Sequence, residues 1–96
     1  MQAVLPEGSV LNFPNLFNPN TTIAYHLDEA SPVWLTIYNS MGQQVRTLVQ
    51  TYQLSGYYEV EWNGRDASGR PVSSGLYLYR LVNRAGVYNG RMLLLK

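Results

Sequence analysis

The sequence predicts an all-β fold, an antiparallel β-sandwich of two sheets and about seven strands. Short runs rich in Tyr, Thr, Val and Ile alternate apolar with polar residues, which is the period of a half-buried strand. Clusters of Gly, Pro, Asn, Asp and Ser separate these runs, and no window shows a competing helical period. The chain has 96 residues, a length that suits one domain.

The first half of the chain contains three expected strands. A short strand is expected near residues 10–13. Pro14 and Pro19 follow it, and because proline donates no backbone hydrogen bond, we expect the intervening "NLF" at a sheet edge or in a crossover. The runs 21–27 and 32–39 alternate clearly. Their expected inward residues are Ile23, Tyr25, Leu27, Val33, Leu35 and Ile37. Their expected outward residues are Thr22, Ala24, His26, Trp34, Thr36 and Tyr38.

The second half of the chain supplies four more expected strands. A weaker run, 43–49, follows a turn at Gly42, and further runs cover 57–62, 75–82 and 87–95. The residues expected to face inward in the two middle runs are Tyr58, Val60, Trp62, Tyr77, Tyr79 and Leu81. Those expected to face outward are Tyr57, Glu59, Glu61, Leu78 and Arg80.

The last run ends in three consecutive leucines before a terminal lysine. Because strand side chains alternate between faces, Leu93 and Leu95 must point outward if Met92 and Leu94 point inward. The outward pair then lacks an obvious core. A strand buried on both faces would accommodate it, and so would a partner that binds the exposed strand edge.

A long ordered turn is expected in "WNGRDASGRPVSSG", whose glycines supply positive φ angles. The oxygen atoms of Asn63, Asp66 and Ser68 superficially resemble a calcium loop. The stretch lacks the ligand spacing and the bidentate glutamate of such a loop, and one carboxylate does not balance a divalent ion. We therefore expect Asp66 to accept hydrogen bonds from nearby backbone amides. Asn63, Gly64, Asp66 and Gly69 are interpreted as a structural turn.

Composition argues against several classes of function. There is no cysteine, which removes disulfides, thiolate metal sites and thiol catalysis. A net charge of +1 with 14% charged residues gives no basic face for nucleic acid. No stretch reaches the ~18 apolar residues of a membrane span. His26 and Asp28 could pair, but no motif places a serine or threonine beside them. We expect no catalytic residues, no cofactor and no metal.

Four stretches together resemble a known family. They are "LNFPNLFNPNTTIAYHL", "VWLTIYNSMGQQVRTLV", "GYYEVEWNGRDASGRPVSSGLYLYRL" and "GRMLLLK". In this order and spacing they resemble the C-terminal sorting domains of type IX secretion cargo (type A). Those domains overlap with the immunoglobulin-like module of the flagellar hook-capping protein. The resemblance covers nearly everything from Leu11 to Lys96 and implies an immunoglobulin-like sandwich.

The chain departs from the family pattern at three positions. In the first motif, roughly Y-P-N-P-F-N-P, Leu16 stands in for a proline. In the W-D-G-R-D-x-x-G turn, Asn63 replaces the first aspartate, and both changes keep turn chemistry. The family ends in a basic pair, an apolar run and a final lysine. Arg91 and Lys96 match that ending, whereas Gly90 occupies the other basic position.

The resemblance implies a non-catalytic passenger module. Proteins with such a domain enter the periplasm by a separate N-terminal signal, and an outer-membrane translocon then recognises the domain. A sortase-like peptidase commonly removes it and joins the cargo to lipopolysaccharide at the cell surface. Residues 1–10 are then a linker or a strand from a preceding cargo domain, and residues 11–96 are the sorting domain. The residues expected to be recognised are Arg91, Met92, Leu93, Leu94, Leu95 and Lys96.

Two alternatives stay open at this point. One is a purely structural immunoglobulin-like module of the hook-capping type. The other is a carbohydrate-binding module, in which the outward aromatic residues Trp34, Tyr38 and Tyr57 would stack on sugar rings. The sequence leaves the oligomeric state open as well, since an exposed edge strand could pair with a second copy.

Overall fold

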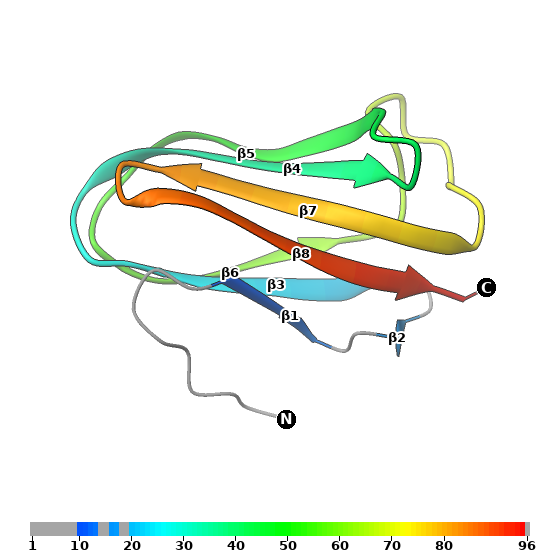
Figure 1. The fold of residues 1–96 in the computed structure, drawn as a ribbon, viewed down its shortest axis with the longest axis horizontal. Coiled ribbons are helices and arrows are strands. Elements are labelled where there is room, and N and C mark those ends of the chain that lie inside the picture. Colours follow the sequence, from blue (N-terminus) through cyan, green and yellow to red (C-terminus); the bar gives the residue numbers. More distant parts are fainter. Residues whose placement is uncertain (1–9, 14–15, 18–19, 96) are drawn as a thin grey trace.

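The computed structural model describes residues 10–13, 16–17 and 20–95, which form eight strands in two layers (Figure 1). In chain order the strands are β1 (Val10–Phe13), β2 (Leu16–Phe17), β3 (Thr21–Leu27), β4 (Ser31–Asn39), β5 (Gln44–Gln53), β6 (Gly56–Trp62), β7 (Gly75–Asn83) and β8 (Gly86–Leu94). The count exceeds the predicted seven because part of "NLF" forms β2, a strand of its own at a sheet edge.

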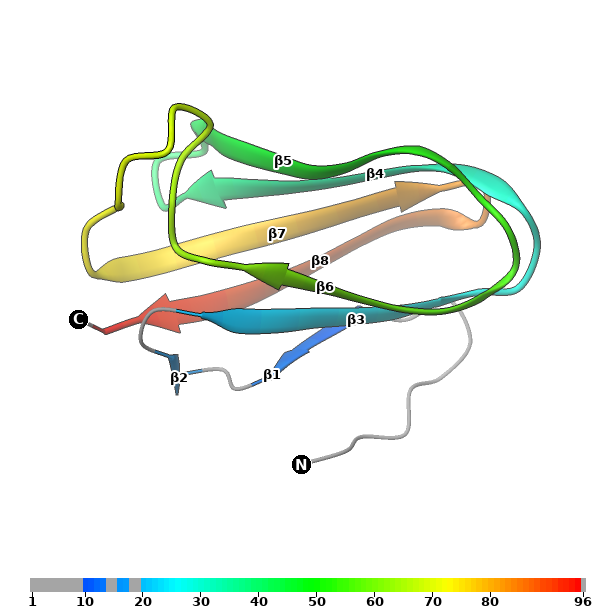
Figure 2. The same cartoon turned by 180° about the vertical axis from the view of Figure 1, so that it is seen from behind.

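The two layers are a three-stranded sheet in the order β1-β3-β6 and a five-stranded sheet in the order β2-β8-β7-β4-β5. Figures 1 and 2 show these sheets facing each other, with β7 and β8 on one side and β3 and β6 on the other. Every pairing is antiparallel except that of β2 with β8, which is parallel. The predicted all-β antiparallel sandwich is therefore confirmed. Within the described ranges, no helix is long and apolar enough to cross a membrane.

The core lies between the sheets and follows the predicted alternation. Trp62 is fully enclosed and meets Tyr77 edge to face, with ring centroids 5.3 Å apart. The Trp62 indole nitrogen donates a 2.9 Å hydrogen bond to the backbone oxygen of Arg65, which ties the core to the turn after β6. The buried core residues are Ile23, Tyr25, Leu27, Val33, Leu35, Ile37, Trp62, Tyr77, Tyr79, Leu81, Met92 and Leu94.

A second aromatic pair lies within the three-stranded sheet, and one of its hydroxyls reaches the other sheet. The rings of Tyr25 and Tyr58 stack with centroids 5.4 Å apart. The Tyr25 hydroxyl donates a 2.6 Å hydrogen bond to Oε1 of Gln53, which lies at the end of β5 in the opposite sheet. Burial raises the pKa of Tyr25 to about 12. The hydroxyl therefore stays a neutral donor across the physiological pH range.

Three sequence expectations differ from the structure in detail. Ala24 and Thr36 were expected to be outward and exposed, yet they are only 0% and 8% exposed. Both are small and lie on strands with neighbours on each side, so adjacent side chains cover them. The strand predicted over 43–49 is β5, which continues to Gln53 because polar residues are tolerated on an exposed edge strand.

Gly90 fits under the ring of Tyr79. The two residues are directly opposed on β8 and β7, so their side-chain positions share the inner face. A Cβ at position 90 would lie 2.0 Å from Cζ of Tyr79, whose own side chain is 4% exposed. The glycine supplies the space that the tyrosine ring fills. A basic residue, which the family pattern carries here, would have to displace that ring.

We expect Gly90→Ala to lower the free energy of unfolding by about 1–3 kcal/mol, because an added methyl group overpacks the space under Tyr79. Chemical denaturation measures the change. The neighbouring exposed change Asn89→Ala is the control and should stay within about 0.5 kcal/mol of the parent chain. Adding Tyr79→Leu should make the Gly90→Ala penalty smaller, since the two sites are coupled. An unchanged stability for Gly90→Ala would contradict this packing.

Candidate functional site

The side chains of the C-terminal strand β8 alternate between two faces, and Leu95 follows directly after the strand ends at Leu94. Met92 and Leu94 are 1% and 0% exposed and belong to the core. Leu93 and Leu95 are 43% and 46% exposed. The described part of the chain thus places the leucines on opposite faces, as the alternation predicts. The terminal Lys96 lies outside the described residues.

A third exposed leucine joins the outward pair, and the sequence reasoning missed it. Leu76 on β7 is directly opposite Leu93 on β8, so both side chains stand on the outer face of the five-stranded sheet. Leu76 is 40% exposed. The signal was available: an inward Tyr77 requires an outward Leu76. The apolar surface at this end therefore spans two strands.

The backbone edge beside the tail is partly covered, which differs from the expectation of an open edge. Strand β2 pairs with β8 at two positions, Leu16 with Leu93 and Phe17 with Leu94. From Gly86 to Met92, no strand among the described residues pairs with this outer edge of β8. The tail is therefore accessible through the exposed side chain of Leu93.

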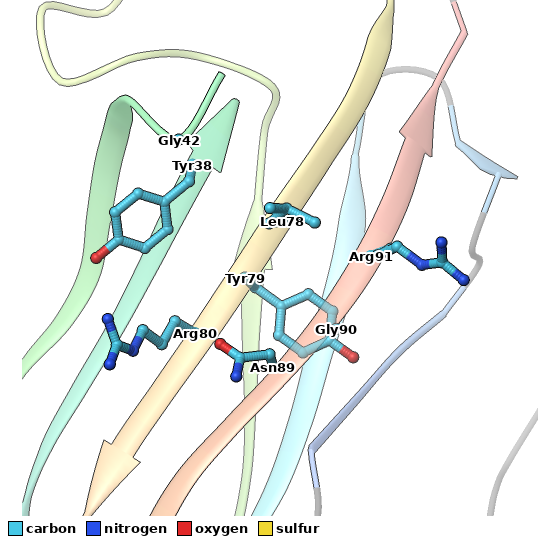
Figure 3. Close-up of a pocket in the computed structure, with 8 residues that line it drawn as sticks. All are labelled: Tyr38, Gly42, Leu78, Tyr79, Arg80, Asn89, Gly90 and Arg91. Carbon is cyan, nitrogen blue, oxygen red and sulfur yellow. The ribbon is translucent and has the colours of Figure 1, made fainter. Parts of the chain in front are cut away.

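A hollow of about 430 Å³ lies on the outer face beside the tail (Figure 3). Tyr38, Leu78 and Arg91 form one cross-strand row over β4, β7 and β8. Arg80 and Asn89 stand opposite each other in the next row. Arg91, the matched basic residue of the C-terminal motif, thus lines a surface depression that reaches the middle of the sheet.

The turn between β6 and β7 is held by Asp66. Its Oδ1 accepts hydrogen bonds from the Ser68 amide at 3.0 Å, the Ser68 hydroxyl at 2.8 Å and the Arg70 amide at 3.0 Å. The Ser68 hydroxyl and the Arg70 and Ser68 amides hold the pKa of the Asp66 carboxyl below its usual range. Gly64 and Gly69 have φ angles of 73° and 87°, which glycine adopts readily.

Asn63 anchors the start of the same turn. Its Oδ1 accepts hydrogen bonds of 3.2 Å from the Arg65 amide and from Nη1 of Arg46 on β5. The amide of Ala67 also donates to the backbone oxygen of Val45 on β5 at 3.1 Å. The turn is thereby fixed to the five-stranded sheet. Among the described residues, no group of three or more His, Cys, Asp or Glu side chains could hold a metal ion.

His26 and Asp28 lie together at one end of the sandwich, beside Ser31. Nδ1 of His26 is 3.2 Å from Oδ1 of Asp28, and both side chains are substantially exposed. Ser31 lines the same small surface hollow. Its hydroxyl donates to the backbone oxygen of Pro32 and accepts a hydrogen bond from the Arg84 amide. These two hydrogen bonds join the start of β4 to the turn after β7.

The three outward aromatic residues do not form one platform. Trp34 and Tyr38 lie on β4 in the five-stranded sheet, whereas Tyr57 lies on β6 in the three-stranded sheet. The hydroxyl of Tyr57 donates a 2.7 Å hydrogen bond to Glu59. Trp34 and Tyr38 are four residues apart on one strand, a separation of ~13 Å. A sugar ring stacked on one of them would not reach the other.

Comparison with known proteins identifies a family and two similar folds. Residues 17–86 match the family model described as "FlgD Ig-like domain". The dimeric latent PorU from Porphyromonas gingivalis contains a similar fold, with a TM-score of 0.72 and 20% identity over 99% of this chain and 10% of that chain. FlgD from P. aeruginosa gives a TM-score of 0.62 and 21% identity over 77% of this chain and 61% of that chain.

These two likenesses show the fold alone, because the identities are low. The chain spans about a tenth of the length of the PorU chain and less than two thirds of the FlgD chain. No protein with curated annotation is detectably similar to this chain in sequence.

We expect Asp66→Asn to reduce the loss of thermal stability in acid. The pKa of Asp66 is lower in the folded than in the unfolded state, so its contribution is present above the unfolded-state pKa and is lost as pH falls through the folded-state pKa. Asparagine keeps the Oδ1 acceptor but does not titrate in this range. Asp66→Ala removes the acceptor and should lower the melting temperature at every pH.

Circular dichroism melts from about pH 7 to about pH 2 would test the Asp66 prediction. Glu61→Gln is the matched control, since that carboxyl is exposed on β6 and forms no hydrogen bond with the described residues. Parallel pH profiles for the parent chain and Asp66→Asn would show that ionisation of the Asp66 carboxyl does not contribute to stability.

Proposed function

The chain belongs to the FlgD Ig-like domain family, and we propose that it acts within this family as a non-catalytic C-terminal sorting domain. In this proposal it directs a preceding cargo domain through the type IX outer-membrane secretion system to the cell surface. Its partners are the outer-membrane secretion machinery and a sortase-like peptidase. The basis is the motif resemblance combined with an immunoglobulin-like sandwich whose last strand carries exposed leucines.

The observation that carries the proposal is the exposure of Leu93 and Leu95. At this end of the sheet they stand with Leu76, which makes three exposed leucines on one face. A partner that covered the exposed part of each leucine would contribute roughly 1 kcal/mol per side chain, because full burial of an exposed leucine contributes about 1.5–3 kcal/mol and these are 43% and 46% exposed. Met92 and Leu94, inserted in the core, hold these leucines at a fixed position. The tail is thus a rigid apolar surface that a receptor can bind.

A second candidate function has its own supporting observation. The family match ends at residue 86, before the tail begins, so the matched part is the sandwich itself. A purely structural immunoglobulin-like module of the hook-capping type would need no export address. In that case the exposed leucines would contact a neighbouring domain or subunit, and the chain would not carry a reporter across the outer membrane.

Point substitutions test the tail better than a deletion does. Removing residues 92–96 would also remove Met92 and Leu94, and losing such core side chains costs about 2–5 kcal/mol each. A chain of this length has a total stability of only about 5–14 kcal/mol. A deleted chain could therefore unfold, and its loss of export would say nothing about recognition.

We expect the double change Leu93→Asp and Leu95→Asp to abolish export while leaving the fold intact. Residues 1–96 would be fused to a periplasmic reporter in a host with a type IX system, and surface reporter would be measured by protease accessibility. Exposed substitutions usually change stability by less than about 0.5 kcal/mol, so the melting temperature should barely move. Charge on the outward face removes the apolar contact that a receptor would make.

The matched control is Leu54→Asp, because Leu54 is 68% exposed at the far end of the sheet near β5. That variant should reach the surface at the parent level. Retention of the parent fusion in the periplasm would favour the structural module. Normal export of the double variant would show that the tail leucines are not the address.

A further inference from the structure

The outer face of the five-stranded sheet is apolar at both ends. This outer face is defined by the side chains that β4, β7 and β8 turn away from the core. At one end Trp34, Val82 and Val87 form a cross-strand row, and Trp34 and Val87 are 44% and 49% exposed. At the other end stand Leu76 and Leu93. The outer face therefore has an apolar row at each end, and the rows that contain Arg91 and Arg80 lie between them.

The middle of the outer face carries positive charge without a counter-charge. Strands β2, β4, β5, β7 and β8 contain no aspartate or glutamate. Arg80 and Arg91 are exposed there, and neither guanidinium forms an ion pair or hydrogen bond with any residue that the structure describes. The described carboxylates lie elsewhere, in the turn after β3, on β6 and in the turn after it: Asp28, Glu29, Glu59, Glu61 and Asp66.

The two arginines flank the hollow from opposite sides. Figure 3 shows the Arg80 side chain extending toward β4 and the ring of Tyr38, while the Arg91 side chain extends toward the opposite sheet edge. Leu78 and Asn89 lie between them. The hollow thus has an aliphatic floor, one amide and a guanidinium on each flank. Guanidinium groups bind carboxylates with two parallel hydrogen bonds.

We propose that this outer face docks against a protein surface on which carboxylates stand among apolar side chains, with Arg80 and Arg91 as the paired cations. This inference rests on the proposed function, because the docking protein would be the receptor that also contacts the tail. Protein interfaces are enriched in Trp, Tyr and Arg and depleted in Lys and Glu. The outer face has this composition, and it is continuous with the exposed Leu93.

Two other occupants fit the surface less well. A second copy turning the same face would bring arginines against arginines, which repel. A copy turning the outer face of its three-stranded sheet would offer Glu59 and Glu61, but Glu59 already accepts a hydrogen bond from the Tyr57 hydroxyl. An acidic glycan would satisfy the guanidinium groups, yet it would leave the leucines and valines without contacts.

The test uses Arg80, because it lies on β7 and outside the C-terminal motif. In the reporter fusion, Arg80→Glu should lower surface reporter by about tenfold, the order expected when a paired interfacial charge is reversed. The matched control is Arg70→Glu, an exposed arginine in the turn between β6 and β7. It should be exported at the parent level. Melting of each purified domain by circular dichroism confirms that both variants fold.

The outcomes separate this inference from the proposed function. A parent fusion that never reaches the surface overturns both. If the parent fusion and the Arg80→Glu fusion are exported equally, only the proposal of the docking face is overturned. In affinity electrophoresis, polygalacturonate in the gel would slow the parent domain if the face bound an acidic glycan, and Arg80→Glu would abolish that slowing. Concentration-dependent association in sedimentation, lost in Arg80→Glu, would assign it to a second copy. Either result would contradict a carboxylate-bearing receptor protein.

Discussion

The alternation of side chains along the last strand is the constraint on which the rest depends. A β-strand turns successive residues to opposite faces, so a core that takes Met92 and Leu94 must leave Leu93 and Leu95 in solvent. A slip of one residue would exchange the two sets. The pairing of β8 with β7 on one side and with β2 at its end prevents that slip. The exposed leucines are therefore a fixed surface.

The turn after β6 contributes to that rigidity from a distance. The Asp66 carboxylate and the Trp62 indole bond the turn to itself and to the core, and the Ala67 amide bonds it to β5. The turn leads directly into β7, the strand that pairs with β8. β7 pairs with β8 along its whole length, so the turn adjoins the strand pair that contains the tail.

Much of the fold could be predicted from the sequence, because alternation and turn residues are local signals. The inward residues of the runs 21–27 and 32–39 could be assigned without tertiary information, and so could the hydrogen-bonding role of Asp66. Other features depend on residues that are distant in the sequence. Ala24 is buried because strands lie on both sides of it, and the need for glycine at position 90 is explained only by the ring of Tyr79. The hollow between Arg80 and Arg91 also required the cross-strand register, which spans separate runs.

The most direct measurement is site-specific photo-crosslinking in living cells. A photoreactive amino acid at position 93 of an exported fusion should form an adduct with an outer-membrane protein, whereas the same group at Tyr52, which is 58% exposed near the end of β5, should not. That result would show that the outward leucine position meets the secretion machinery. Export without any adduct from position 93, or equal adducts from both positions, would contradict recognition through the outward face of β8.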